Sequence, residues 1–466
     1  MPETSLQNNY PWWRRVGWFW AVFFVLAALT VFAVLVAAFY AEENWRGKQA
    51  WEHCQHEFEA KGTSINWNDY IPPAVPDDQN FFKAPKMTAW FVKNQSVLSN
   101  ELTAKLQSKD TTTTNLDEAF AVKYLAWSDQ FAPDFDLIRS AAQRPYARMD
   151  GDYSIPYQIP IPNFVAVRIV AQTLAQRAKC QLRLGQPAKA MADLTLLHDL
   201  RHLLEAAPTG RPMTLVAAMI NVAITGLYAN TLADGLRAHA WQEPQLVELQ
   251  KQLADINLNL YVCHALQTEP VGVCRDFELQ SWSLDKFFSF GRKPNCRDKL
   301  YGWLWPQGWT YQNMVNVVNL ETIPLAGFDL VHDTIAPHQF DTMSRANEAF
   351  YNHMSPYKLL AALAVPNFIK AEQTTAFNQT LVNQAQIVCA LERYRLAQGH
   401  YPETLDTLVP QFIQKMPHDL IGGEPLVYRR TNDGKFLLYS IGWNETDDDG
   451  KPGTLADVKT GDWVWQ

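Results

Sequence analysis

The sequence contains few of the local patterns that identify enzymes. No two glycines stand one residue apart, so the Gly-x-Gly-x-x-Gly loop that binds dinucleotides is absent, and neither Gly-x-Ser-x-Gly nor Cys-x-x-Cys occurs. Catalytic sets that assemble across a fold leave no such trace, so a metal-dependent hydrolase stays an alternative. Nothing in the sequence positively indicates an enzyme.

Clusters of basic residues are also lacking. The chain has 466 residues, and its 48 acidic residues exceed its 40 lysines and arginines, for a net charge of -8. A nucleic-acid-binding surface needs basic residues gathered on one face, so nucleic acid is not an expected partner. With 47% hydrophobic residues, a chain of this length can bury more than one core, and we expect two or three folded units.

Charge is missing altogether from residues 16–41. As a helix rising about 1.5 Å per residue, this run would span roughly 39 Å, more than the hydrocarbon core of about 30 Å. A signal peptide usually has an apolar region of only about 7–15 residues, and Phe39-Tyr40-Ala41 is a poor cleavage site. The sequence therefore predicts an uncleaved transmembrane helix at 16–41.

The charges beside this run indicate its orientation. Arg14 and Arg15 precede it, whereas Glu42 and Glu43 follow it before the next basic residue. Positive flanks stay on the cytoplasmic side, so residues 1–15 are predicted to be a cytoplasmic tail and the rest of the chain to lie outside the cytoplasm. In a bacterium this is a single-pass inner-membrane protein with a periplasmic body.

Cysteine is scarce, with six residues in all. The periplasm permits disulfides, and fifteen full pairings of six cysteines are possible. Cys263, Cys274 and Cys296 fall in one stretch, so one local bridge, such as Cys274 to Cys296, is a hypothesis. Cys180 and Cys389 lie in helical patterns and are expected to be small buried side chains.

Helical periodicity is clearest from residue 163 onward, which indicates a mainly α fold. Asn163 is a good N-cap, Gly185 a good stop, and Pro187 opens a second helix expected to reach Leu204. This pair resembles one tetratricopeptide-type helical hairpin, but a solenoid needs about three copies and no second one is found. Further helices are predicted at 42–61, 214–233, 244–265 and 376–398.

The C-terminal hundred residues combine that last helix with two predicted strands, 425–430 and 435–441, joined by a Thr-Asn-Asp-Gly turn. Motif residues occur there at characteristic spacing: Gly399, Tyr401, Pro402, Pro417, Asp419, Gly422, Pro425, Tyr428, Ser440, Gly442 and the 460–463 segment. In this order they resemble the C-terminal domain of the major pseudopilin of type II secretion systems. The resemblance covers about 90 residues and implies a small antiparallel sheet followed by a calcium loop.

The departures from that family matter for function. A pseudopilin begins with a hydrophobic helix continuous with this domain, whereas the helix near residue 370 is polar and the apolar run lies far upstream. A fibre subunit is therefore not expected. The predicted organisation is a juxtamembrane and connector region at 42–150, a helical ectodomain at 151–365, and a pseudopilin-like domain at 366–466.

An acidic loop follows the second predicted strand, with four carboxylates between residues 445 and 449. Calcium takes six to eight oxygen ligands, which such a loop can supply, while a solvated acidic turn is the alternative. The spacing does not fit an EF-hand. The resemblance implies that Asn444, Asp447, Asp449 and Asp457 are the calcium ligands.

Two other groups suggest chemistry more weakly. His198 and His202 have the spacing of a zinc-protease helix, but Asp199 replaces the catalytic Glu, so ordinary polar histidines are expected. The His-Cys-Gln-His stretch at 53–56 is likewise expected to be a solvated helix face. Residues 277–316 are rich in aromatics, including Trp303, Trp305 and Trp309. If exposed, these rings would suit cell-wall sugars; packing in a core or interface is the more ordinary role.

The function predicted from the sequence is a membrane-anchored extracytoplasmic protein with a structural or protein-interaction role, linked to secretion or envelope assembly. Its expected partners are one membrane and a protein of the envelope. A cell-wall or carbohydrate-binding module is the first alternative, and a metal-dependent hydrolase the second.

Overall fold

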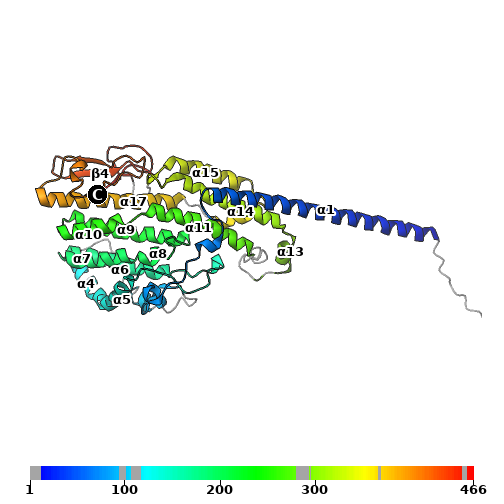
Figure 1. The fold of residues 1–466 in the computed structure, drawn as a ribbon, viewed down its shortest axis with the longest axis horizontal. Helices are drawn as coiled ribbons and strands as arrows, with labels where there is room; N and C mark the ends of the chain where they lie inside the picture. Colours follow the sequence, from blue (N-terminus) through cyan, green and yellow to red (C-terminus); the bar gives the residue numbers. More distant parts are fainter. Residues whose placement is uncertain are drawn as a thin grey trace, which may run out of the picture.

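A computed structural model shows a mainly helical body from which one long helix projects (Figure 1). The structure describes residues 12–93, 101–106, 117–279, 293, 295–365, 369–453 and 459–465. The helices are α1 (Trp12–Ala60), α2 (Met87–Phe91), α3 (Glu101–Leu106), α4 (Glu118–Ser128), α5 (Ala132–Ala142), α6 (Phe164–Arg183), α7 (Pro187–Asp199), α8 (His202–Glu205), α9 (Leu215–Arg237), α10 (Glu243–Ala254), α11 (Leu258–Glu278), α13 (Cys296–Leu304), α14 (Gln307–Thr322), α15 (Pro337–Asn352), α16 (Leu359–Ala364) and α17 (Ile369–Gln398).

Besides the α-helices and several short 3-10 helices, the described residues form two small antiparallel sheets. One pairs β1 (Phe328–Asp329) with β2 (Thr334–Ile335), and the other has the order β3-β4-β5. The strands of the second sheet are β3 (Val427–Arg430), β4 (Phe436–Ser440) and β5 (Trp463–Val464). The prediction of a mainly α protein with a little antiparallel sheet near the C-terminus is confirmed.

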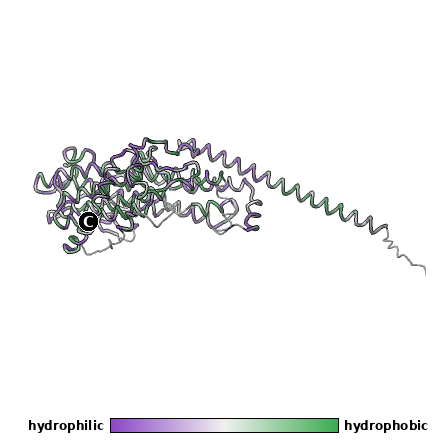
Figure 2. The backbone as a smooth tube through the Cα atoms, turned by 90° about the horizontal axis from the view of Figure 1, so that it is seen from below, coloured by the Kyte–Doolittle hydropathy of each residue, from purple (hydrophilic) through white to green (hydrophobic). Residues whose placement is uncertain are grey.

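Helix α1 is one continuous helix, not a transmembrane helix followed by a separate one at 42–61. Between Gly17 and Phe39 nearly all side chains are exposed, and the most apolar window of this helix is 0% buried. Figure 2 shows the hydrophobic colour along the projecting part and a change to hydrophilic where the helix meets the body. In length and composition α1 is compatible with a single membrane span. Helix α9 is also apolar, but 61% of its most apolar 18-residue stretch is buried, as in a core helix.

The C-terminal half of α1, around residues 43–47, packs very closely on the start of α14. A Cβ atom added to Gly47 would lie 2.3 Å from the Gly308 carbonyl oxygen, and one added to Gly308 would lie 1.9 Å from the Glu43 carbonyl oxygen. The Gly308 N–H donates to Asn44 Oδ1 at 2.8 Å. Because the two backbones touch, both positions require glycine.

A buried carboxylate holds the same junction together. The Glu43 side chain accepts hydrogen bonds from Arg46 at 2.6 Å, Trp309 Nε1 at 2.9 Å and the Tyr357 hydroxyl at 3.0 Å. Burial acts to raise the pKa of Glu43, but these donors outweigh it and lower the pKa. The apolar helix is therefore fastened to the body by contacts with two segments more than 260 residues away.

The body is a stack of helices (Figure 1). The predicted hairpin is present: the Asn163 side chain accepts from the Ala166 N–H at 3.1 Å, Gly185 adopts a φ of +66°, and Pro187 begins α7. Helix α9 packs against α6, α7 and α17, and α11 lies against α14 (Figure 1). Helix α7 ends at Asp199 rather than near Leu204, and the short α8 follows it.

The helix predicted at 244–265 is two helices in the structure. Helix α10 ends at Ala254, and α11 begins at Leu258 after an Asn257 cap that accepts from the Leu260 N–H at 2.8 Å. The Leu258 N–H donates to the buried Gln379 of α17 at 2.7 Å. A tertiary partner thus satisfies a backbone group that the break in the helix leaves free.

The C-terminal unit follows the predicted order. Helix α17 ends before Gly399, whose φ is +80°, and β3 and β4 form a hairpin with Val427 opposite Tyr439 and Arg430 opposite Phe436. The predicted strands are confirmed, each shorter by one or two residues at its ends. β5 adds to β4 as a third strand.

Candidate functional site

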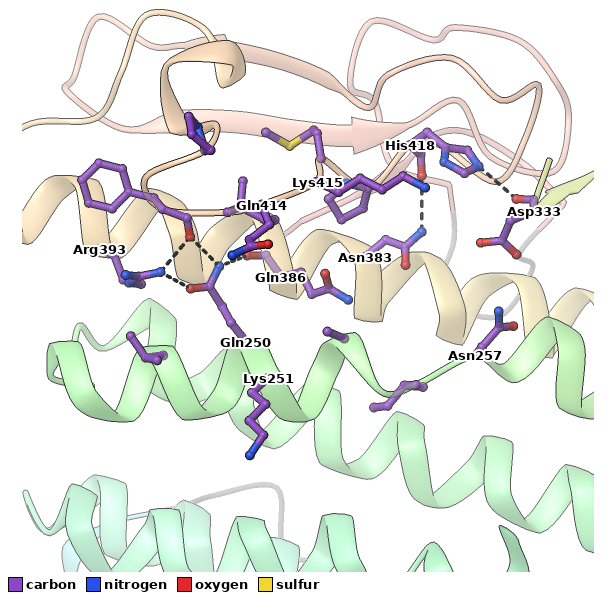
Figure 3. A pocket seen from close by; sticks show the side chains of 18 of the residues that line it. Gln250, Lys251, Asn257, Asp333, Asn383, Gln386, Arg393, Gln414, Lys415 and His418 are labelled. Atoms are coloured by element: carbon purple, nitrogen blue, oxygen red, sulfur yellow. Dashed lines mark hydrogen bonds between the residues drawn. The ribbon is translucent and has the colours of Figure 1, made fainter. Parts of the chain in front are cut away.

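A groove with a volume of about 780 Å³ lies between α10, α17 and the chain at 410–418 (Figure 3). Its floor comes from a polar stripe on α17, where Gln379, Asn383, Gln386 and Arg393 recur at helical spacing. Gln250 faces this stripe from α10. Side-chain amides are therefore the most frequent polar groups in the lining, beside a similar number of apolar side chains.

Hydrogen bonds hold the chain at 410–418 over the groove. Arg393 donates to the Phe412 carbonyl at 2.7 Å, and Gln250 Nε2 donates to the same oxygen at 3.1 Å. Farther along, Asn383 Nδ2 donates to the His418 carbonyl at 3.3 Å, and His418 Nε2 lies 3.0 Å from the Asp333 carbonyl oxygen (Figure 3). Both ends of the covering segment are thus fixed.

The residues that line the groove include three cationic side chains, Lys251, Arg393 and Lys415, and one carboxylate, Asp333. Lys251 points away from the 410–418 chain, as Figure 3 shows. Arg393 is engaged by Glu243 Oε1 at 2.8 Å. The described contacts give Lys251 and Lys415 no ion pair, and both are exposed. Gln250, Gln379 and Asn383 already bond to the protein's own backbone, so Gln386, Gln414 and the exposed Lys415 are the polar groups that could meet an extended, acidic ligand.

The predicted calcium ligands Asn444, Asp447 and Asp449 lie in the loop after β4. Asp449 Oδ1 accepts from Arg429 at 2.6 Å, Asp447 Oδ1 accepts from the Tyr439 hydroxyl at 3.0 Å, and Asn444 Nδ2 donates to Asp448. The structure brings Asn444, Asp447 and Asp449 into one loop.

Protein groups therefore compensate part of the loop's negative charge. Asp457 lies outside the described residues. Within the described part of the chain no group of three or more His, Cys, Asp or Glu side chains is arranged to hold a metal. The Arg429–Asp449 pair is exposed, however, and such pairs contribute at most about 1 kcal/mol, so an ion could displace the arginine. Calcium binding stays a prediction.

Asp462, which follows the acidic loop in sequence, binds the loop backbone, a contact that the sequence did not predict. Its buried carboxylate accepts from the Asp448 N–H at 3.2 Å and the Gly450 N–H at 2.7 Å. Burial raises the pKa of Asp462, and the neighbouring charges of Asp447 and Asp448 act in the same direction. The loop is ordered around a carboxylate that lies beyond it in sequence.

Two of the motif segments in the C-terminal unit contact each other. Asp419 Oδ1 accepts from the Ser440 hydroxyl at 2.7 Å and from the Ile421 N–H at 3.0 Å, and Oδ2 accepts from the Ile441 N–H at 3.1 Å. Burial raises the pKa of Asp419, and these donors act against it. Asp419 thus joins the turn before β3 to the end of β4, a structural role.

The structure does not support a zinc site at the two histidines. His198 is buried, with Nε2 3.2 Å from the Gln252 carbonyl oxygen, while His202 is exposed and belongs to α8. The two rings meet edge to face with centroids 6.3 Å apart, but within the described part of the chain no third His, Cys, Asp or Glu is arranged with them to hold a metal. At 53–56 the two histidines are exposed and Cys54 is buried, as expected for an ordinary helix.

Of the three tryptophans named above, two are engaged in packing and one is exposed. Trp305 and Trp309 are partly buried, and their rings meet edge to face at 88° with centroids 5.2 Å apart. Trp305 Nε1 donates to Thr310 at 3.1 Å, and Trp309 donates to Glu43. Trp303 is 78% exposed. The rings of Trp305 and Trp309 therefore pack within the protein, which is the more ordinary role expected from the sequence.

The hypothesis of a Cys274–Cys296 bridge is wrong for this structure, in which all six cysteines are free. Cys274 is buried in α11 with its sulfur 3.7 Å from the Met314 carbonyl oxygen, whereas Cys296 is exposed at the start of α13. Cys180 and Cys389 are buried thiols, as expected.

Two buried glutamates were not anticipated from the sequence either. Neither oxygen of Glu321 in α14 or of Glu372 in α17 finds a hydrogen-bond partner among the described residues. Burial raises the pKa of Glu372 to about 8, and it raises the pKa of Glu321 well above its usual value, with the charge of Glu269 adding to the effect. A pKa of about 8 keeps Glu372 mainly protonated at pH 7.

Comparison with protein-family models, curated proteins and solved structures finds no match for this chain. The pseudopilin-like and tetratricopeptide-like resemblances therefore stay predictions. Function has to be argued from the exposed apolar helix and from the groove.

Proposed function

We propose that this chain is a single-span membrane-anchored protein with a structural or protein-interaction role. The observation that carries the proposal is the exposed apolar stretch of α1, which is continuous with a helix fastened to the body at Glu43, Gly47 and Gly308. Isolated in water, such a stretch would expose large apolar side chains on every face. A bilayer removes them from water while the body stays at its surface.

The proposed orientation places residues 1–15 in the cytoplasm and the body outside it, at the periplasmic face of a bacterial inner membrane. Arg14 and Arg15 before the apolar run support this orientation. The pseudopilin-like order of motifs supports a link to secretion or envelope assembly.

The groove is the proposed docking place of the protein partner. The amides of Gln386 and Gln414 can pair with the backbone of an extended segment, while Lys415 favours acidic side chains or a C-terminal carboxylate. The carbohydrate alternative gains no specific support, because Trp305 and Trp309 are engaged in packing.

The anchor is tested by extracting membranes with alkaline carbonate, which strips peripheral proteins but not helices that span. We expect the full chain to stay in the pellet. The orientation is tested by adding a membrane-impermeant maleimide to intact cells, where Cys296 is the exposed thiol. Labelling without lysis supports the proposal; labelling only after lysis contradicts it.

The groove is tested with two fluorescent ten-residue peptides, one alternating Glu and Gly and one alternating Gln and Gly. We expect the detergent-solubilised chain to bind the acidic peptide more tightly, and the Lys415→Glu variant to lose this preference. Lys435→Glu, on the exposed β3–β4 turn, is the matched charge control. Equal affinity for both peptides in the unmodified chain would remove the groove from the proposal.

A further inference from the structure

Helix α13 exposes an apolar patch beside the point where α1 leaves the body. Leu300, Tyr301, Trp303 and Leu304 are 49%, 42%, 78% and 45% exposed. They occupy the C-terminal half of the nine-residue helix, at i, i+3 and i+4 spacing. Large side chains gathered in this way on a soluble surface indicate a contact surface.

The patch is joined to the apolar surface of α1. The Tyr40 hydroxyl donates to the Leu304 carbonyl at 2.6 Å, and the Phe39 ring meets Trp309 edge to face at 6.3 Å. Figure 1 shows α13 beside α1 at the end of the body from which α1 projects. The exposed apolar surface of α1 thus continues onto α13.

The position of this contact along α1 matches a membrane boundary. From Trp20 to Tyr40 the helix rises by roughly 30 Å at about 1.5 Å per residue, which equals the hydrocarbon thickness of about 30 Å. Trp18 and Trp20 are exposed at the other end of this interval, 70% and 58% respectively. If these tryptophans mark one interface, Tyr40 and the end of α13 lie at the other.

The charge of α13 fits the same surface. Arg297 and Lys299 are exposed in its first half, whereas its acid, Asp298, is buried and accepts from the Asn295 N–H at 2.9 Å. The Arg297 guanidinium lies over the Tyr301 ring at 5.5 Å. Two exposed cations beside an apolar patch are typical of a helix that lies in the headgroup region of an anionic bilayer.

We propose that α13 is a second membrane contact, lying in the interface of the same bilayer that α1 spans, with its patch among the acyl chains and Arg297 and Lys299 at anionic headgroups. This inference rests on the proposed anchor. Together the two contacts hold the body in one fixed orientation on the membrane, because a single span alone leaves it free to swing.

The test measures the depth of a nitroxide label in the full chain, reconstituted in vesicles of phosphatidylcholine with 25% phosphatidylglycerol. Each labelled protein carries Cys296→Ser, to remove the exposed native thiol, and one new cysteine: Trp303→Cys in the patch, Val31→Cys in α1, or Asn432→Cys on the β3–β4 turn. Trp303, Val31 and Asn432 are all exposed, so each tolerates the label. Depth is read from collisions with oxygen, which enters lipid, and with a nickel chelate, which stays in water.

We expect the Val31 label to collide chiefly with oxygen, the Asn432 label chiefly with the nickel chelate, and the Trp303 label to have a higher oxygen-to-nickel ratio than Asn432. Adding Arg297→Glu/Lys299→Glu should lower the Trp303 ratio in the anionic vesicles and leave the Val31 ratio unchanged. In pure phosphatidylcholine this effect of the charge reversal should shrink.

Failure of the two proposals can be told apart. A Val31 label in water would remove the anchor itself. A Val31 label in lipid with a Trp303 label as accessible to the nickel chelate as Asn432 would overturn only the second contact. Spin–spin broadening at Trp303, with shielding from both reagents, would show a second copy of the chain on the patch and would likewise overturn it.

Discussion

Replacing Glu372 by glutamine should change how the stability of the protein depends on pH. The pKa of Glu372 is raised by burial from its ordinary 4.5 to about 8. The folded state therefore binds a proton more tightly than the unfolded state, and its stability falls as the pH rises from about 4.5 to about 8. At about 1.36 kcal/mol per pKa unit, this loss is at most roughly 5 kcal/mol.

The glutamine variant lacks this titration, so its stability relative to the unmodified protein should rise with pH. The measurement is the thermal midpoint in detergent micelles, read from tryptophan fluorescence at pH 5 to 9. With an unfolding entropy of about 2.1 cal/mol/K per residue, 5 kcal/mol corresponds to about 5 °C if the chain unfolds as one unit. The offset between variant and unmodified protein should grow by up to that amount between pH 5 and 8.

The exposed Asp78→Asn variant is the matched control, and its offset is expected to stay constant over the same range. Glu321 titrates in both proteins and cancels in the comparison. An offset for Glu372→Gln that does not change between pH 5 and 9 would refute the reasoning, because it would mean that the buried carboxylate is ionised or has found a partner.

Three further predictions concern the anchor and the C-terminal unit. Gly47→Val should separate α1 from α14 and lower the thermal midpoint, at a cost of about 1–3 kcal/mol in the free energy of unfolding. Gly17→Val, at an open position of the same helix, should leave the midpoint unchanged. Equal midpoints for the two variants would contradict the close contact. Asp419→Ala should cost about 2–4 kcal/mol in chemical denaturation, since three buried donors lose their acceptor, and a cost near zero would show that water replaces it. Millimolar calcium should raise the thermal midpoint, and Asp447→Asn should abolish this rise. If calcium does not shift the thermal midpoint of the unmodified protein, the prediction of calcium binding is wrong.

Several features of the fold could be predicted because their causes are local. The apolar character of residues 16–41 depends only on composition, and the helix start at Asn163, the stop at Gly185 and the β3–β4 turn each depend on neighbours within about four residues. The same reasoning failed at 255–257, where the break between α10 and α11 is supported by Gln379 from another helix.

The candidate site was beyond the reach of the sequence because its parts come from distant segments. Gln250 and Phe412 meet through a hydrogen bond across 162 positions, and the buried Glu43 is satisfied by Trp309 and Tyr357, which no local pattern pairs with it.

The sequence by itself determined a mainly helical chain with one long apolar stretch, since hydrophobic transfer and capping are properties of short segments. Only the tertiary structure decided that Glu43 is buried and paired, that Glu372 is buried with no hydrogen-bond partner among the described residues, and that amides of α10 and α17 line one groove. Burial and pairing depend on which helices pack together, and that is a property of the whole chain.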